Sequence, residues 1–243
     1  MTTQAHTQGN PASAEAQTQA QAQAQAAAHA LIAKWQGKDG SERANYQMFI
    51  TELCDVLGVP RPEPAHHDQR ENPYVFERRV RMAFGDGNDT SCFLDCYRRD
   101  AFVLEAKKVR AAPHTQGFQT AMLGARQQAE NYARALPQSE GRPPFLIVID
   151  VGHVIELYAE FSRSGGTYTP FPDTRSHRIA LADLAQPQVR ERLRKVWMAP
   201  MSLDPARLAL AAEDQGHLHA GRPGRPAVGQ APVGAAARHA GLR

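Results

Sequence analysis

The large apolar side chains of this chain lie mostly in its middle part, first at helical spacing and then in short runs typical of strands. A helical pattern begins at about Ala30, pauses at residues 37–40 and restarts at Ser41, which is a favourable N-cap residue. The second helix should end at Gly58, just before Pro60, because glycine readily adopts the left-handed conformation that follows many helices. Its predicted buried face consists of Tyr46, Phe49, Ile50, Leu53 and Leu57.

Five later segments have the composition of β-strands. The second and third of them are separated by a short turn at residues 99–101, so together they predict a hairpin. A helix is expected from about Phe118 to Leu136, between this hairpin and two further buried strands. This order of elements predicts an α/β fold, a mixed β-sheet flanked by helices. The strand candidates are residues 74–84, 92–97, 102–106, 144–150 and 153–158.

Both ends of the chain lack the side chains that build a hydrophobic core. Residues 1–28 are rich in Gln, Ala and Thr, and we expect a disordered leader that is helical at most in part. Residues 206–243 are dominated by Ala, Gly, Arg and Pro and predict a disordered, low-complexity tail. The change of composition after about Leu208 suggests a truncation or a frameshift, with a natural disordered tail as the alternative. One folded domain is therefore expected over residues 29–205.

Two carboxylates and a lysine, Asp95, Glu105 and Lys107, lie in the predicted hairpin. Side chains alternate along a strand, so Glu105 and Lys107 should share a face, and the turn should place Asp95 opposite Glu105. Facing carboxylates, together with the backbone carbonyl of Ala106, suit Mg²⁺ or Mn²⁺. Lys107 would orient or help deprotonate an attacking water and offset charge on a phosphate. The alternative is a surface ion pair, but the apolar neighbours of these residues predict burial, which is costly for charges.

The pattern Asp-x9-Glu-x-Lys resembles the signature of the PD-(D/E)xK nucleases. The resemblance is more specific to one branch of these nucleases, the amino-terminal nuclease domain of MmeI-like single-chain restriction-modification enzymes. It is carried by residues 41–60, 74–80 and 102–107. The resemblance runs from about Leu31 to about Pro205 and implies a core like that of restriction endonucleases. In that family, the polypeptide continues through a helical spacer, an adenine methyltransferase and a target-recognition domain. Of these parts, the present sequence resembles only the nuclease.

The resemblance also implies further residues around the three charged ones. Glu77 stands where many nucleases of this fold have an extra acidic residue near the metal; the alternative is an ion pair with Arg79 or Arg81 on the same strand. Gln128 and Tyr132, four positions apart on one helical face, resemble the QxxxY element of RecB-like nucleases. In those nucleases the element helps to set the site against the DNA strand.

The net charge of +3 is too small to indicate DNA binding by itself. Local charge is more informative, because basic side chains surround the proposed site and suit a phosphate backbone. Lys108 directly follows the three charged residues and is expected to help position DNA. The basic clusters consist of Arg78, Arg79, Arg81, Arg98, Arg99, Lys107, Lys108 and Arg110.

The cysteine content and the hydropathy pattern predict the cellular location. Cys54, Cys92 and Cys96 lack the spacing of a disulfide framework, which is typical of a reducing compartment. No apolar run approaches the length of a transmembrane helix, and the amino terminus lacks the pattern of a secretory signal. We therefore expect a cytoplasmic protein without a membrane partner.

Together, these features predict a magnesium-dependent endonuclease domain that hydrolyses phosphodiester bonds in double-stranded DNA, with a homodimer as one route to double-strand cleavage. The alternative is an inactive fragment of a bifunctional restriction enzyme and adenine methyltransferase, acting at most as a DNA-binding module. Methyltransferase activity is not expected. The segment Asn72-Pro73-Tyr74 lacks the second proline of the motif that receives the flipped base, and no glycine-rich loop for the methyl donor precedes it.

Overall fold

The computed structural model describes residues 11–38, 42–83 and 89–210. The chain divides into two units, Met1–Asp204 and Pro205–Arg243, and the first contains the sheet with its helices. None of the described helices is long and apolar enough to cross a membrane.

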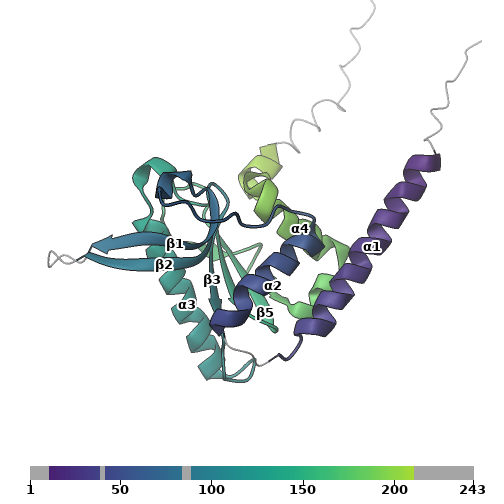
Figure 1. The fold of residues 1–243 in the computed structure, drawn as a ribbon, viewed down its shortest axis with the longest axis horizontal. Helices are drawn as coiled ribbons and strands as arrows, with labels where there is room; N and C mark the ends of the chain where they lie inside the picture. The colour runs from purple at the N-terminus through teal and green to yellow at the C-terminus, as the bar shows by residue number, and fades with distance from the viewer. Residues whose placement is uncertain (1–10, 39–41, 84–88, 211–243) are drawn as a thin grey trace, which may run out of the picture. The chain divides into compact units, whose positions relative to one another are not determined.

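A seven-stranded mixed sheet forms the centre of the first unit (Figure 1). Its strands follow the order β1-β2-β3-β4-β5-β6, and β7 also pairs with β5. Among the described strands, β3 and β4 alone run parallel, which requires the crossover connection that a helix provides between them. The mixed sheet predicted from the sequence is therefore confirmed. The strands are β1 (Tyr74–Ala83), β2 (Asp89–Arg98), β3 (Phe102–Lys107), β4 (Phe145–Asp150), β5 (Val154–Ala159), β6 (Thr169–Pro170) and β7 (Arg178–Ala180).

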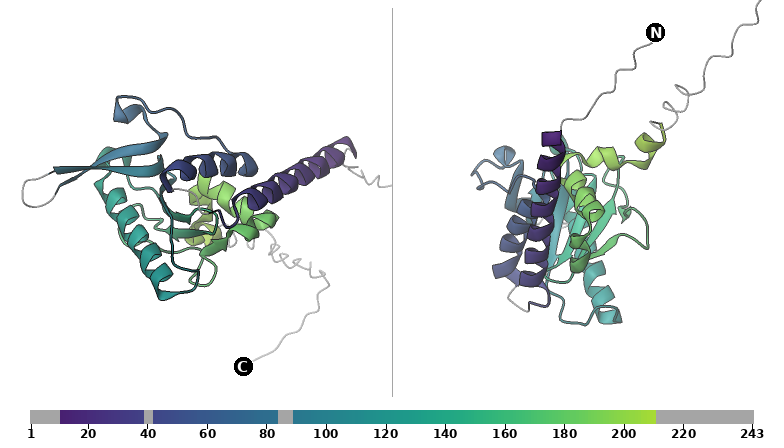
Figure 2. Two further views of the ribbon diagram at one scale, coloured as in Figure 1. Left: turned by 60° about the horizontal axis from the view of Figure 1, so that its bottom comes forward. Right: turned by 90° about the vertical axis from the view of Figure 1, so that its right-hand side faces the viewer.

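Helices cover both faces of the sheet, as predicted. Helices α1, α2 and α4 contribute to one hydrophobic core, and α3 packs on the opposite face with a second core (Figure 2). The side chain of Thr115 caps the α3 amino terminus by accepting a hydrogen bond from the Phe118 amide. The α-helices are α1 (Pro11–Trp35), α2 (Glu42–Leu57), α3 (Gln116–Ala135) and α4 (Pro187–Met198). The 3₁₀ helices are η1 (Gln69–Glu71), η2 (Gln138–Glu140), η3 (Leu181–Ala185) and η4 (Pro200–Leu203).

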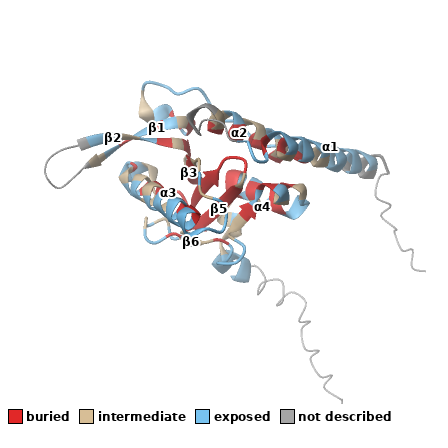
Figure 3. Ribbon diagram, turned by 90° about the horizontal axis from the view of Figure 1, so that it is seen from below, coloured by how far each residue is buried: buried red, intermediate tan, exposed pale blue. Residues whose placement is uncertain are grey.

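The two central parallel strands are buried on both faces (Figure 3). Every residue of β4 is buried, and in β3 only Lys107 is partly exposed. Apolar runs without alternation are typical of strands that have helices on both sides. A charged side chain in β3 or β4 is therefore removed from bulk water and needs partners within the protein.

The expected leader is helical where the structure describes it. Residues 11–28 form the first part of α1, and most of their described side chains are exposed. Ala28 is buried, however, and the Gln25 side-chain oxygen accepts a hydrogen bond from Arg190 in α4 at 3.0 Å. Packing contacts thus begin slightly before residue 29, because a helix carries even small side chains onto its neighbours. The domain boundary at this residue stays a prediction.

The carboxyl-terminal tail lies mostly outside the described residues. Residues 205–210 are helical, and the remainder of the predicted tail, 211–243, is not described. The expected disorder and the expected frameshift therefore stay predictions.

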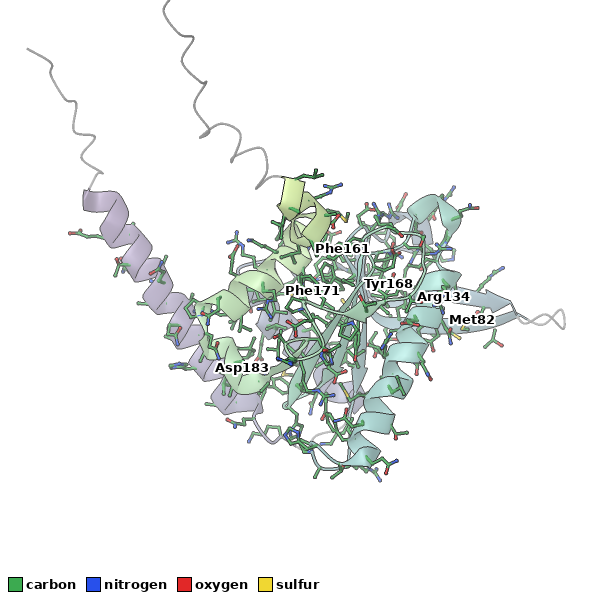
Figure 4. All side chains as sticks on the ribbon, turned by 180° about the vertical axis from the view of Figure 1, so that it is seen from behind. Met82, Arg134, Phe161, Tyr168, Phe171 and Asp183 are labelled. Atoms are coloured by element: carbon green, nitrogen blue, oxygen red, sulfur yellow. The ribbon has the colours of Figure 1, made fainter. Side chains whose placement is uncertain are left out.

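Strands β1 and β2 extend beyond the rest of the sheet. They pair with each other from Tyr74 opposite Arg98 to Ala83 opposite Asp89, whereas β2 pairs with β3 only over residues 96–98. The outer parts, residues 78–83 and 89–94, form a two-stranded ribbon (Figure 1). In Figure 4 this ribbon is identified by its labelled residue Met82.

Candidate active site

The hairpin of β2 and β3 sets Asp95 opposite Glu105. Cys96 pairs with Leu104 and Arg98 with Phe102, and the same register continued by one position places Asp95 across from Glu105. The turn at residues 99–101 is the one expected from the sequence. The main-chain pairing of β2 with β3 ends at Cys96, and at Asp95 the side chain, not the backbone, contacts β3.

Asp95 itself binds the backbone of β3. Its Oδ2 atom accepts a hydrogen bond from the Ala106 amide at 2.7 Å. Within a strand, the N–H and C=O groups of one residue point to the same neighbouring strand. The carbonyl of Ala106 therefore also points toward β2, on the side of Asp95. A carboxylate and a carbonyl oxygen thus face the same gap between the two strands.

Glu105 lies under α3 and accepts two hydrogen bonds. It is 2% exposed, and its Oε1 atom accepts from the Lys107 ammonium at 2.7 Å and from the Gln128 amide at 2.6 Å. The expected shared face of Glu105 and Lys107 is thus present. The Gln128 side chain also donates to the Tyr132 hydroxyl at 3.1 Å. One polar network therefore joins β3 to α3.

Tyr132 remains a neutral hydrogen-bonding group at physiological pH. Burial raises the pKa of Tyr132 to about 12, and the neighbouring Cys92 and Glu105 add to the rise. Gln128, which donates a hydrogen bond to the hydroxyl, acts in the opposite direction. The spacing of Gln128 and Tyr132 predicted that both would lie on one helical face, and their hydrogen bond agrees with this.

Glu77 occupies an unusual backbone position opposite Asp95. The pairs Phe76–Cys96 and Arg78–Leu94 flank it on either side, so Glu77 and Asp95 face each other across β1 and β2. Its φ of 53° lies in the left-handed region, which is uncommon for a residue other than glycine. Such conformations are often found at functional sites.

At Glu77 and Asp95, the side-chain alternation of β1 and β2 is interrupted, so that the same set of alternate positions changes from one face of the sheet to the other. Phe76 and Cys96 pack with the core of α1, α2 and α4, whereas Val80 and Leu94 pack with the core of α3. Residues two positions apart normally share a face, so the regular alternation is broken between Cys96 and Leu94. Alternation alone therefore does not determine the orientation of Asp95. Its bond to the Ala106 amide does.

Glu77 has a hydrogen-bond partner in α2. The Tyr46 hydroxyl donates to Glu77 Oε1, and the Gln47 side chain donates to the Tyr46 hydroxyl at 3.0 Å. Burial raises the pKa of Tyr46, and the charges of Glu77 and Asp95 add to the rise. Tyr46 thus lies within electrostatic reach of both carboxylates. The alternative expectation for Glu77, an ion pair with a neighbouring arginine, is not the contact observed; Arg79 instead donates to the Ser91 hydroxyl.

A buried carboxylate beside Lys107 was not anticipated. Asp150 pairs with Lys107 in the parallel ladder of β3 and β4, and it is 2% exposed. Its Oδ1 atom accepts a hydrogen bond from the Val109 amide at 3.1 Å, which holds the segment after β3. A cavity of about 400 Å³ lies here, and Lys108 contributes to its lining together with Asp150 and His153. The sequence signal was an acidic residue at the end of an otherwise apolar run.

Arg78, a member of the basic clusters, is not available to a ligand. Arg78 is 2% exposed and forms an ion pair with Glu140, which also accepts a hydrogen bond from the Tyr97 hydroxyl at 2.7 Å. The expectation that Arg78 faces DNA is therefore wrong, because its guanidinium is used inside the fold. Arg79 and Arg81 are exposed.

The oxygen donors fit a hard divalent cation that keeps part of its water shell. Among the described residues, no group of three or more His, Cys, Asp and Glu side chains is close enough to form a metal site by itself. Mg²⁺, however, is commonly bound by one or two carboxylates and completed by water and phosphate oxygens. Asp95, Glu105 and the Ala106 carbonyl supply a donor set of this kind.

One known protein family matches most of this chain. The chain matches the family described as MmeI, N-terminal domain, over residues 16–213, a range that includes all the candidate residues. No curated protein and no solved structure matches it. The match begins before the expected domain start at residue 29 and ends after residue 205. The chain therefore belongs to the family of MmeI N-terminal domains, the nuclease domain of MmeI-like restriction enzymes.

Proposed function

We propose that this domain is a metal-dependent DNA endonuclease whose cation, Mg²⁺ or Mn²⁺, is held by Asp95, Glu105 and the Ala106 carbonyl. The observation that carries the proposal is the register of β2 and β3, which continues to Asp95 across from Glu105 where the ladder ends, with the Asp95 carboxylate bonded to the Ala106 amide. Lys107, 2.7 Å from Glu105, supplies a positive charge beside them. Family membership makes the domain the endonuclease part of a restriction enzyme, for which DNA is the substrate.

The side chains around the carboxylates have separate roles in phosphodiester hydrolysis. A bound divalent cation supplies Lewis-acid activation of the phosphate and a more acidic water. The Lys107 ammonium would orient the attacking water and offset the negative charge that develops on the phosphate. Gln128 fixes the Glu105 carboxylate, and Tyr132 fixes Gln128, so the carboxylate is already oriented before substrate arrives.

Glu77 and Lys108 have supporting roles in this proposal. Glu77 is a further oxygen donor on the far side of Asp95, held by Tyr46. Lys108 lines the cavity at the end of β3 and contacts the DNA backbone there. The substrate is double-stranded DNA in the cytoplasm, and a homodimer would bring a second site to the other strand.

The proposal is tested by nicking of supercoiled plasmid in Mg²⁺, Mn²⁺, Ca²⁺ or EDTA. Glu105→Gln removes a ligand charge and Lys107→Ala removes the neighbouring cation, so each should abolish metal-dependent nicking. Glu191→Gln and Lys195→Ala remove the same charges from exposed positions of α4 and should nick like the parent.

Each outcome of this assay has a defined meaning. Metal-dependent nicking that disappears only in the two site variants supports the proposal. DNA binding by the parent protein without nicking in any metal would leave the alternative, a non-cleaving DNA-binding module. Nicking that survives Glu105→Gln would show that the activity does not come from this site.

A further inference from the structure

The ribbon formed by the outer parts of β1 and β2 has two chemically different faces. Arg79 pairs with Phe93, and Arg81 pairs with Ser91, so these four side chains share one face. All four residues are exposed, Phe93 to 50%. This face therefore combines two guanidinium groups and a hydroxyl with one exposed aromatic ring. We call this surface the outer ribbon face.

The opposite face attaches the ribbon to the body of the domain. Val80 is buried in the α3 core, where the partly buried Cys92 packs against it, and the Cys92 thiol contacts the Met82 sulfur at 3.7 Å. A two-stranded ribbon is only marginally stable by itself, so this packing onto α3 is what supports it. The outer ribbon face is consequently presented in a fixed orientation.

The base of the ribbon is fixed by a buried ion pair. Arg78 donates to Glu140 in η2 and to the side chain of Gln69, the latter at 2.9 Å. Glu140 also accepts from the Tyr97 hydroxyl in β2, so both strands are tied to the segment that follows α3. The two arginines next along β1, Arg79 and Arg81, remain on the surface.

We infer that the outer ribbon face binds duplex DNA next to the cleavage site, an inference that rests on the proposed function. Guanidinium groups bind phosphate oxygens in a bidentate manner and suit a phosphate backbone better than other cations. The Ser91 hydroxyl accepts two hydrogen bonds from Arg79, at 3.2 and 2.9 Å, which orients this guanidinium along the face. A two-stranded ribbon also has the dimensions of a major-groove ligand.

The position of the ribbon supports the same partner. Phe93 lies two residues from Asp95, about 7 Å along the strand. One strand of a duplex places a phosphate about every 3.4 Å along the helix axis. The outer ribbon face is thus only two or three nucleotides from a phosphate bound at Asp95. The ribbon is therefore within the length of duplex that flanks a phosphate bound at Asp95.

The test measures DNA binding without cleavage. Duplex affinity is determined by fluorescence anisotropy in EDTA over a range of KCl concentrations, in the parent and in the double variant Arg79→Ala/Arg81→Ala. We expect weaker binding and a salt slope smaller by about 1.8, since each phosphate contact contributes about 0.9. The matched control is Arg175→Ala/Arg194→Ala, which removes two exposed arginines outside the ribbon, one between β6 and β7 and one in α4.

A second variant distinguishes a direct contact of the outer ribbon face with DNA from a general effect of positive charge. Phe93→Ala removes no charge, so it should lower the affinity and leave the salt slope unchanged. Thermal unfolding of each variant checks that the fold is retained, which the exposure of these side chains predicts. Equal losses in the ribbon double variant and in the control double variant would overturn the inference. So would unchanged binding in a folded Arg79→Ala/Arg81→Ala protein. Because metal is absent, either result stands apart from the nicking assay that tests the proposed function.

Discussion

The hydroxyl of Tyr46 in α2 donates a hydrogen bond to Glu77 in β1, opposite Asp95. This contact connects α2 to the position where the side-chain alternation of β1 and β2 is interrupted. A non-glycine residue in the left-handed region costs about 1–3 kcal/mol, so the surrounding structure has to stabilise it. Tyr46, 2% exposed and itself bonded to Gln47, is a rigid donor suited to this purpose.

Replacing Tyr46 by phenylalanine should affect metal binding more than stability. Tyr46→Phe removes one hydrogen bond, with an expected cost of about 1 kcal/mol in the free energy of unfolding. If Glu77 is an oxygen donor to the cation, its loss of orientation should weaken Mn²⁺ binding by about 10-fold or more. Electron paramagnetic resonance of free Mn²⁺ measures this directly.

A suitable control for Tyr46→Phe is Tyr168→Phe. Tyr168 is also fully buried, and its hydroxyl donates to the Pro143 backbone carbonyl at 2.6 Å rather than to a carboxylate. We expect this variant to lose stability and to keep its Mn²⁺ affinity. Equal Mn²⁺ affinity in both variants would remove Glu77 from the donor set.

Gln128 is expected to act on the site by orienting Glu105. Gln128→Ala removes the 2.6 Å bond to Glu105 and the bond to Tyr132. Residues that orient metal ligands typically contribute 10–100-fold to affinity or activity, so nicking should fall by about this factor. Because the role is positional, higher Mn²⁺ concentration should restore part of the rate. A complete loss that no metal concentration relieves would indicate a direct role for Gln128.

The hairpin register was predictable because it depends on local sequence. The turn at residues 99–101 fixes which residues face each other, and therefore sets Asp95 against Glu105. The buried face of α2 followed equally from its spacing, as the full burial of Phe49, Ile50 and Leu53 confirms. These predictions required no knowledge of contacts between distant segments.

The remaining site features depend on tertiary structure. The left-handed conformation of Glu77 breaks the alternation on which the sequence argument relied. Asp150 becomes the neighbour of Lys107 only through the parallel pairing of β3 with β4, across the whole of α3. Tyr46 had the spacing of a core residue, and the sequence does not distinguish a core aromatic from one whose hydroxyl reaches a carboxylate.

The cysteines should differ in their reaction with thiol reagents. Burial raises the pKa of both Cys54 and Cys96, so their reactive thiolate forms are rare in the native state. Cys92 is only partly buried, on the ribbon. We expect a disulfide reagent such as DTNB to modify one thiol rapidly in the native protein and all three after denaturation. If the rapid reaction is absent in Cys92→Ser, the fast thiol is that of Cys92. Three rapidly reacting thiols in the native protein would contradict the burial of Cys54 and Cys96.

Glu160 should make stability depend on pH in the acid range. Burial would raise its pKa, but hydrogen bonds from Ser162, Gly165 and Ser164 outweigh this and lower the pKa below its usual value. The folded state therefore binds this proton less readily than the unfolded state does. Its stabilising effect is complete above the unfolded pKa of about 4.3 and is lost as the pH falls through the folded value.

The corresponding variant is Glu160→Gln, compared with the parent by urea denaturation at pH 7 and at pH 3. The variant should be less stable at pH 7, and the difference should decrease at pH 3, where the parent carboxylate becomes protonated. A difference that is constant between the two pH values would show that the carboxylate charge is not the cause.

Replacement of Lys107 should affect DNA cleavage much more than DNA binding. Its ammonium contacts Glu105 at 2.7 Å, and its side chain is 27% exposed, so it contributes at most one phosphate contact among many. Lys107→Ala should therefore abolish nicking, while duplex affinity falls slightly and the salt slope decreases by about 1 at most. The measurement pairs the nicking assay with salt-dependent anisotropy on the same preparation, with Lys195→Ala as the control for loss of an exposed lysine. If binding collapsed while nicking continued, the lysine would serve DNA attachment, and its assignment to the reacting phosphate would have to be withdrawn.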